Sequence, residues 1–459
     1  MTHRFLLCVA ILGAVAVSLV VLQATPSDRI SDAVQARMAR DGVPGVVVVV
    51  LENGIPAWTR AFGYADPATG REMTADALFR VESITKPVTA WGAMRLAETG
   101  HLNLDAPISD CLARWQPPDG TPPLTPRQLL SHSAGIGLGD FAERYAPDAP
   151  RPGLAEHLAE DFEILAPAPT AFSYSDTGFN LLELVIEDCT GEDIAAFMIR
   201  EVLGPLGMEQ AGFDWPGVEM PVGHDLHGRP VAPYVYSGRA SGGLFATAGD
   251  VARFAAAAMN RADQDVLSPG VVAELHRPAV AVGRLFGFAA EGYGLGHFTD
   301  TLSNGRIAVW HGGQGYGWMS HLHLVPETGD GIVILANSQR AWPLFANVLR
   351  LWSESLGVQP VGMTRVLWAE TAARVAIAGL SLVAALALWL AVTGASRSGA
   401  VRAIAGAASA ALIVWPLWAA GQDYLFLFSI LPGLWPWLAG SCGIAGLCLA
   451  ALALGRQQQ

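Results

Sequence analysis

Apolar residues follow three different patterns along this chain of 459 residues. Short runs rich in β-branched residues predict strands, and stretches in which apolar residues recur every three or four positions predict helices. Long runs with almost no charge lie near both ends and predict membrane spans. The helices predicted in this way cover residues 28–41, 83–98, 179–188 and 342–356, and the predicted strands cover residues 45–51, 58–64, 305–310, 320–325 and 331–336.

The order of these elements indicates the fold class. Strands are predicted near both ends of the 28–356 region, whereas residues 105–235 are rich in Pro and Gly and carry short helical patterns. Asn53-Gly54 is a hairpin signal between the first two strands. We therefore expect an α+β domain whose antiparallel sheet is closed by its two ends, with a helical insertion.

The first uncharged run predicts a targeting segment over residues 1–24. It is either a signal anchor or a cleaved signal peptide. We favour the anchor because residues 5–22 carry no charge and are just long enough to span a bilayer.

The last part of the chain, residues 365–456, predicts a multi-pass attachment to the cytoplasmic membrane. Arg397 and Arg402 lie in the loop between the first two predicted spans, and the positive-inside rule places that loop in the cytoplasm. Residues 25–357 then lie outside, on the periplasmic or extracellular side. The three predicted spans cover about residues 375–393, 401–420 and 425–454.

Composition limits the function classes. The net charge is −13, and nearly all charged residues lie between residues 27 and 374, so nucleic-acid binding is not expected. Cys111 and Cys189 lie in the outer region, where they either form a disulfide or remain buried thiols. His321 and His323 share one face of a strand but have no third ligand in the pattern. No metal ion or organic cofactor is expected, and nothing in the pattern identifies an oligomer.

The basic residues reveal the first candidate for chemistry. Of 28 basic residues, 27 are arginine and one, Lys86, is lysine. A buried lysine can lose its proton and act as a base, whereas arginine cannot. Ser83 lies three positions earlier, and residues three apart share a helix face. This spacing predicts a serine nucleophile beside its base.

Three motifs in the expected order resemble the serine β-lactamase and penicillin-binding family. They are Ser83-Ile84-Thr85-Lys86, then Tyr174-Ser175-Asp176, then His311-Gly312-Gly313. Residues 43–45, 63–66, 129–135 and 242–250 also resemble family segments. The resemblance covers about residues 28–355 and is strongest to the branch with class C β-lactamases, D-aminopeptidases and esterases. It implies a β-lactamase/transpeptidase-like domain.

The resemblance also implies roles for the candidate residues. Ser83 would attack an acyl carbon and form an acyl-enzyme, with Lys86 as its base. Tyr174 would work beside the lysine and then protonate the leaving group. The backbone amides of Ser83 and Gln314 would form the oxyanion hole, with Gly313 beside them in the substrate-binding strand.

Two positions depart from the family pattern. Asp176 stands where the family usually has Asn, and an ionised carboxylate cannot donate a hydrogen bond and would favour charged Lys86. Alternatively, Asp176 caps a helix that begins near residue 177. His311 replaces a lysine that binds the substrate carboxylate, so either it serves substrates without that group, as in D-aminopeptidase and esterase relatives, or it is a structural histidine.

The expected function is therefore a membrane-tethered serine hydrolase that acts through a Ser83 acyl-enzyme. Its substrates would be cell-wall D-amino-acid peptides or related amides and esters, and its other partner would be the lipid bilayer. The alternative is a catalytically weak sensor that binds penicillin or muropeptides and signals through its membrane spans. Asp176 favours this alternative.

Overall fold

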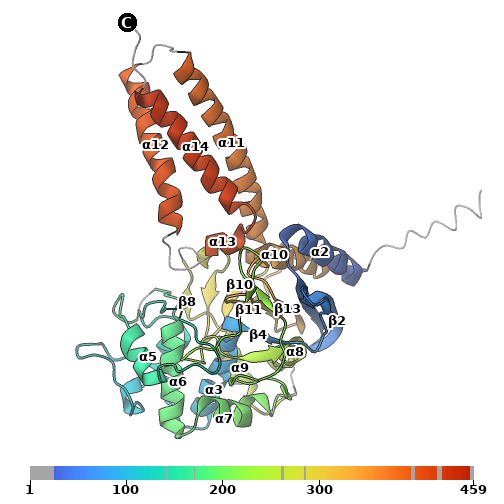
Figure 1. The fold of residues 1–459 in the computed structure, drawn as a ribbon. Coiled ribbons are helices and arrows are strands. Elements are labelled where there is room, and N and C mark those ends of the chain that lie inside the picture. Colours follow the sequence, from blue (N-terminus) through green and yellow to red (C-terminus); the bar gives the residue numbers. More distant parts are fainter. Residues whose placement is uncertain are drawn as a thin grey trace, which may run out of the picture.

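The computed structural model consists of a domain built on one antiparallel sheet and a bundle of apolar helices that projects from this domain (Figure 1). The structure describes residues 25–140, 143–169, 171–259, 263–283, 286–393, 398–420 and 426–454. The predicted targeting segment and Arg397 lie outside these residues.

Nine strands in the described part of the chain form one sheet, in the order β3-β2-β1-β13-β12-β11-β10-β9-β8. Strand β1 pairs with β13 in antiparallel register, so strands from the two ends of the domain meet inside the sheet, as the order of elements predicts. The strands are β1 (Gly45–Glu52), β2 (Ile55–Asp66), β3 (Arg71–Glu72), β8 (Val280–Ala281), β9 (Gly292–Tyr293), β10 (Phe298–Thr301), β11 (Ile307–Gln314), β12 (Met319–Val325) and β13 (Asp330–Ala336).

Alternate residues of β1 enter different cores. Val47 and Val49 pack in the core that contains α3 (Thr85–Glu98) and α8 (Ala248–Ala257). Val46 and Val48 face the opposite core, which is built on α2 (Pro26–Asp41) and α10 (Trp342–Ser355). This strand is buried on both faces, which explains why it reads as a continuous valine run rather than as an alternating pattern.

The insertion is helical and borders the site. Its main helix is α6 (Asp176–Thr190), and around it lie α4 (Pro126–Leu130), α5 (Leu154–Asp161), α7 (Ile194–Met198) and a π-helical turn, η3 (Ile199–Leu203). The remaining short elements are η1 (Glu82–Ile84), η2 (Ile108–Asp110), η4 (Phe286–Phe288), η5 (Gly362–Arg365), α9 (Pro269–His276), and the pairs β4 (Leu78–Arg80) with β7 (Phe245–Thr247) and β5 (Gly223–His224) with β6 (Pro230–Val231).

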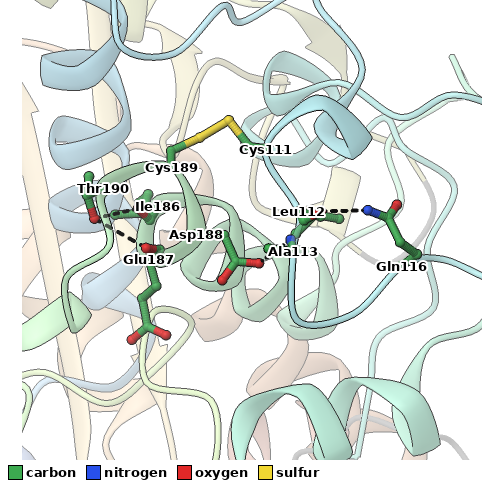
Figure 2. The surroundings of a disulfide bond; sticks show 9 residues. All are labelled: Cys111, Leu112, Ala113, Gln116, Ile186, Glu187, Asp188, Cys189 and Thr190. Carbon is green, nitrogen blue, oxygen red and sulfur yellow. Dashed lines mark hydrogen bonds between the residues drawn. A yellow bond between two sulfur atoms is a disulfide. The ribbon is translucent and has the colours of Figure 1, made fainter.

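A disulfide ties the C-terminal end of α6 to the segment that follows η2. Cys111 and Cys189 are bonded across 78 residues, which settles the alternative left open by the sequence (Figure 2). Asp188 accepts hydrogen bonds from the backbone N–H groups of Ala113 (2.7 Å) and Arg114 (3.1 Å). The end of α6 opposite the site is thus held both covalently and by charge-assisted hydrogen bonds.

The apolar helices α11 (Val366–Val392), α12 (Gly399–Ala420) and α14 (Trp435–Leu454) stand together above the sheet domain (Figure 1). Among the described residues, three helical stretches are long and apolar enough to cross a membrane, at Gly362–Val392, Gly399–Ala420 and Trp435–Leu454. The first helix begins before the predicted residue 375.

The third predicted span, 425–454, is wrong as one continuous element. It is divided into α13 (Phe426–Ile430), at the foot of the bundle, and α14 (Figure 1). Pro432, Gly433 and Pro436 lie around the break, and proline removes a backbone donor while glycine disfavours the helix interior.

Candidate active site

Ser83 lies in the turn that leads into α3. Its Oγ is 3.2 Å from the Lys86 Nζ, so the two side chains share one face of the helix start as their spacing predicts. Thr85 Oγ1 donates to the Glu82 carbonyl (2.6 Å) and accepts from the Leu244 N–H (3.1 Å). These bonds fix the turn against the strand pair β4–β7.

Glu82 holds the same turn from the other side. Its φ of 49° lies in the left-handed region, which is unfavourable for a residue with a Cβ. Its buried carboxylate accepts from Arg80 (3.0 Å), Tyr234 (2.9 Å) and Tyr236 (3.0 Å). A Cβ at Gly315 would lie 2.2 Å from this carboxyl group, so only glycine fits there. No local sequence pattern marks Glu82, because its partners come from distant segments.

Lys86 is fully buried and has three acceptors. Its Nζ donates to Asp176 Oδ1 (2.5 Å), to the Ser241 carbonyl (2.8 Å) and to Ser83 Oγ. Burial lowers the pKa of Lys86 from its ordinary value, and the neighbouring Asp176 carboxylate opposes that shift. The Lys86 ammonium group therefore gives up its proton more easily than a lysine in water does.

Asp176 is the ion-pair partner of Lys86 and not the cap of α6. The cap is Ser175, whose Oγ accepts the Gly178 N–H at 2.8 Å, so the predicted capping role of Asp176 is wrong. Asp176 is the first residue of the helix, where a negative charge is favourable. Its side chain is 20% exposed, so it borders both the lysine and the solvent-facing pocket.

Tyr174 covers the lysine with its ring. The ring centroid is 4.8 Å from Lys86 Nζ and 4.5 Å from the ring of His132. Burial raises the pKa of Tyr174 well above its ordinary value, and Asp176 raises it further, while a hydrogen bond with Ser83 acts in the opposite direction. Tyr174 is therefore a neutral phenol, which suits a proton donor.

His311 packs near Tyr174, and both of its ring nitrogens face groups of the protein. Its Nε2 is 3.2 Å from the Tyr293 hydroxyl and its Nδ1 is 2.9 Å from the Gly312 carbonyl. Burial lowers the pKa of His311 well below its ordinary value, so the ring is neutral at pH 7. The structure brings His311 to the site as a packed neighbour of Tyr174, at 6.1 Å between ring centroids.

The end of β11 passes directly beside the nucleophile turn. A Cβ at Gly313 would lie 2.3 Å from the Val81 carbonyl, so this approach requires glycine. The Gly315 N–H donates to the Trp318 carbonyl, so these two residues form a hydrogen-bonded pair. The next residue pair along the two strands is Gln314 with Met319. Hydrogen-bonded pairs alternate along antiparallel strands, so the Gln314 N–H points away from β12. It lies on the pocket side, where the oxyanion donor is predicted.

The pocket at Ser83 has one strongly acidic wall. The acidic wall consists of Glu143, Asp161 and Asn180, and Ser83 and Gln314 also line the pocket. Among the described residues, the basic side chain within ion-pair distance of Glu143 or Asp161 is His157, at 2.8 and 4.0 Å. The sequence did not mark this wall, because its residues come from a loop and from two helices, α5 and α6.

Three other buried histidines, His132, His321 and His323, have structural positions. His132 accepts the Ser175 N–H through Nδ1 (3.2 Å) and packs on Tyr174, so it orients the second motif. His321 and His323 are fully buried and contact each other, with Nε2 and Nδ1 3.3 Å apart. Within the described ranges, no group of three His, Cys, Asp or Glu residues is arranged to hold a metal ion.

A family model described as Beta-lactamase matches residues 30–351, which is more than half of the chain. The chain belongs to the β-lactamase family. This family member is 29% identical over 346 residues to Esterase EstB of Burkholderia gladioli, covering 64% of this chain and 86% of the esterase. It is 27% identical over 341 residues to Penicillin-binding protein 4 of Amycolatopsis lactamdurans, covering 69% and 87%.

Solved structures agree with this assignment. The octameric penicillin-binding protein homologue from Pyrococcus abyssi superposes with a TM-score of 0.65 at 27% identity, covering 72% of this chain and 78% of that one. The D-amino acid amidase from Ochrobactrum anthropi SV3, complexed with L-phenylalanine amide, gives a TM-score of 0.59 at 22% identity, covering 72% and 99%. This second likeness concerns the fold. The β-lactamase family match ends before α11, so the apolar helices lie outside the matched region.

Proposed function

We propose that this β-lactamase family member is a membrane-tethered serine hydrolase that cleaves amides or esters through a Ser83 acyl-enzyme. The observation that carries the proposal is the buried Lys86 amine, 3.2 Å from Ser83 Oγ and held by Asp176. Burial lowers the pKa of Lys86, which favours the neutral amine that accepts the Ser83 proton.

The proposed reaction has two halves. Ser83 Oγ bonds to the substrate carbonyl carbon, and the resulting oxyanion accepts from the N–H groups of Ser83 and Gln314. When the carbon–leaving group bond breaks, neutral Tyr174 supplies the proton that an amine leaving group needs. The proton that Lys86 took from Ser83 then returns Tyr174 to the neutral phenol. Water attacks the acyl carbon and gives a proton to Lys86, and this proton passes to Ser83 Oγ as the carbon–Oγ bond breaks, which releases the acid and restores the free enzyme.

The acidic wall supports a substrate with a free amine. Glu143 and Asp161 supply negative charge, and the buried Asn180 Oδ1 has no hydrogen-bond partner although its Nδ2 is 3.5 Å from His157 Nε2. All of these groups accept hydrogen bonds, as an ammonium group requires. D-Amino-acid amides and peptides fit this chemistry, and the structural neighbours include a D-amino acid amidase and a D-stereospecific amidohydrolase.

The disulfide supports the proposed location. Disulfides persist in oxidising compartments, so the Cys111–Cys189 bond favours a catalytic domain on the outer side of the cytoplasmic membrane. Cell-wall peptides with D-amino acids are the proposed substrates on that side.

A second candidate function is a weakly catalytic sensor of penicillin or muropeptides. It is favoured by the short Lys86–Asp176 contact, because a carboxylate this close keeps the lysine charged and slows its use as a base. Slow acylation with little turnover would distinguish the sensor from the hydrolase.

Labelling with a fluorescent fluorophosphonate and a fluorescent penicillin tests the proposal on the detergent-solubilised full chain. We expect fluorophosphonate labelling that is lost in Ser83→Ala and kept in Ser303→Ala, which changes an exposed serine outside the pocket. Labelling by penicillin without turnover of amides or esters would instead support the sensor. No labelling of a folded sample by either probe would refute both.

The substrate class is tested with D-alanine p-nitroanilide and its N-acetyl derivative. We expect the free amine to be preferred by roughly tenfold or more in kcat/KM, because a charge-assisted hydrogen bond contributes about 1.5–3 kcal/mol. Glu143→Gln should reduce the preference without reducing hydrolysis of the acetylated compound. Equal rates for both compounds in the parent enzyme would contradict the amine-binding role.

A further inference from the structure

The apolar bundle contacts the oxyanion strand through one buried hydrogen bond. Gln314 Nε2 donates to Ser429 Oγ at 2.9 Å, across 115 residues of sequence. Ser429 lies in α13, at the foot of the bundle beside α10 (Figure 1). Ser429 is fully buried and Gln314 is 8% exposed, so water does not easily replace either partner.

The same glutamine is held on its other side by α10. Its Oε1 accepts from Trp342 Nε1 at 2.7 Å, and the Trp342 ring packs so closely on β11 that a Cβ at Gly312 would lie 2.4 Å from it. The Gln314 side chain is thus fixed between the catalytic domain and the bundle. Its backbone N–H, on the pocket side of the strand, is fixed with it.

Apolar packing places α13 at this position. Ile430 and Leu431 are buried in the same core as Trp342 and Phe345 of α10. Beside it, the buried Arg37 of α2 forms a two-bond ion pair with Glu370 of α11, at 3.1 Å for each bond. The foot of the bundle therefore binds to the catalytic domain through both apolar packing and an ion pair.

We propose that Ser429 is a positioning residue for acyl transfer: through Gln314 it sets the oxyanion donor at the end of β11, so the apolar bundle is part of the working site. This inference rests on the proposed serine hydrolase function. A backbone donor must stay within a few tenths of an ångström of its place to stabilise the oxyanion. Without the Ser429 acceptor, the Gln314 amide would be buried with an unpaired donor and would turn away from its present position.

The test compares Ser429→Ala, Ser429→Thr and Ser381→Ala in the full chain in detergent micelles. Ser381 is exposed on α11 and its Oγ donates to the Ile377 carbonyl of its own helix, at 2.8 Å, so it is the matched control. We expect Ser429→Ala to lower kcat roughly ten- to a hundredfold with KM within about twofold. Ser429→Thr, which keeps the hydroxyl, should restore most of the rate, and Ser381→Ala should match the parent.

A double-mutant cycle with Gln314→Leu separates positioning from general destabilisation. If Ser429 acts through Gln314, the double variant should be no slower than Gln314→Leu alone. Additive losses, or an unchanged kcat in folded Ser429→Ala, would overturn the inference while leaving the hydrolase proposal intact. Lack of turnover in the parent enzyme would instead be a failure of the proposed function.

Discussion

At the scale of single residues, the site is defined by how burial and charge act on a lysine and a tyrosine. Burial lowers the pKa of Lys86 and raises that of Tyr174, because both charged forms lose solvation. Asp176 favours the charged lysine and disfavours the phenolate. In the proposed reaction, Asp176 therefore separates two roles: Lys86 must release a proton before it can accept one, and Tyr174 stays protonated until it donates.

Asp176→Asn tests this division through the pH profile. The carboxylate raises the pKa of Lys86, so its removal should lower that pKa further and leave more neutral amine at each pH. We expect the acidic limb of kcat/KM to move to lower pH by about one unit, equivalent to about 1.4 kcal/mol. Stopped assays across the pH range measure it. A limb that stays in place would show that Lys86 is not the titrating base.

Tyr174→Phe tests the proton donor through the leaving group. Amide hydrolysis should fall by roughly 10²–10⁴, the usual contribution of a positioned acid or base. Cleavage of a p-nitrophenyl ester should fall much less, because p-nitrophenolate leaves without a proton. The comparison of kcat/KM for the two substrate types gives the result, and an equal loss for both would assign Tyr174 a purely structural role.

At the scale of elements, the site depends on the ends of α3, α6 and β11 meeting at one point. Helix α6 brings Asp176 at its first residue, and its far end is anchored by the Cys111–Cys189 bond and by Asp188 (Figure 2). In the middle of the same helix, Glu183 accepts the N–H groups of Arg239 (2.6 Å) and Ala240 (2.7 Å), beside the Ser241 carbonyl that binds Lys86. One helix therefore places two of the three acceptors of the lysine.

Removal of the disulfide should loosen this helix. Replacing Cys111 and Cys189 together by Ser should lower the free energy of unfolding by about 2–4 kcal/mol, because the unfolded chain regains the freedom of a long closed loop. Thermal unfolding with and without a reductant measures the change. Cys448→Ser, at a free cysteine in α14, is the control and should leave the midpoint unchanged.

Glu183 should make stability depend on pH. Burial raises its pKa to about 7 from an ordinary value of 4.5, although Arg239 lowers it. Because the folded-state pKa is the higher one, its contribution is full below about pH 4.5 and is lost as the pH rises through 7. Relative to Glu183→Gln, the parent should lose stability over this window in denaturant titrations. If the free energy of unfolding changed with pH in the same way for both proteins, this assignment would be contradicted.

At the scale of the whole molecule, the catalytic domain and the apolar bundle form a joint at α2, α10, α11 and α13. Arg37 neutralises Asp41 and Glu370 at this joint, with all three side chains less than 10% exposed. Burial raises the pKa of Asp41 to about 6, and Glu370 adds to that shift, while Arg37 opposes it. Arg37 is the buried arginine that bonds both carboxylates, whereas the more exposed Arg40 and Arg374 lie 3.7 Å or more from them.

Arg37→Met tests the contact between the catalytic domain and the apolar bundle. It removes the buried cation that lies closest to both carboxylates, and loss of one partner from a buried ion pair costs about 3–5 kcal/mol. We expect a lower unfolding midpoint in micelles. Arg40→Met is the matched control on the same helix, because Arg40 is 48% exposed and its contacts are 3.9 Å or longer. Equal effects of both changes would refute the special role of Arg37.

The sequence alone determined the fold class, the family, the Ser83–Lys86 pair and the apolar segments, because these depend on local periodicity, short motifs and uncharged runs. The tertiary structure decided what those patterns leave open: the disulfide, Asp176 as ion-pair partner instead of cap, the Glu82 anchor, the acidic wall and the break before α14. The wall, the Glu82 partners and the Gln314–Ser429 contact join residues far apart in the chain. Such contacts depend on how layers pack, and no local pattern encodes that packing.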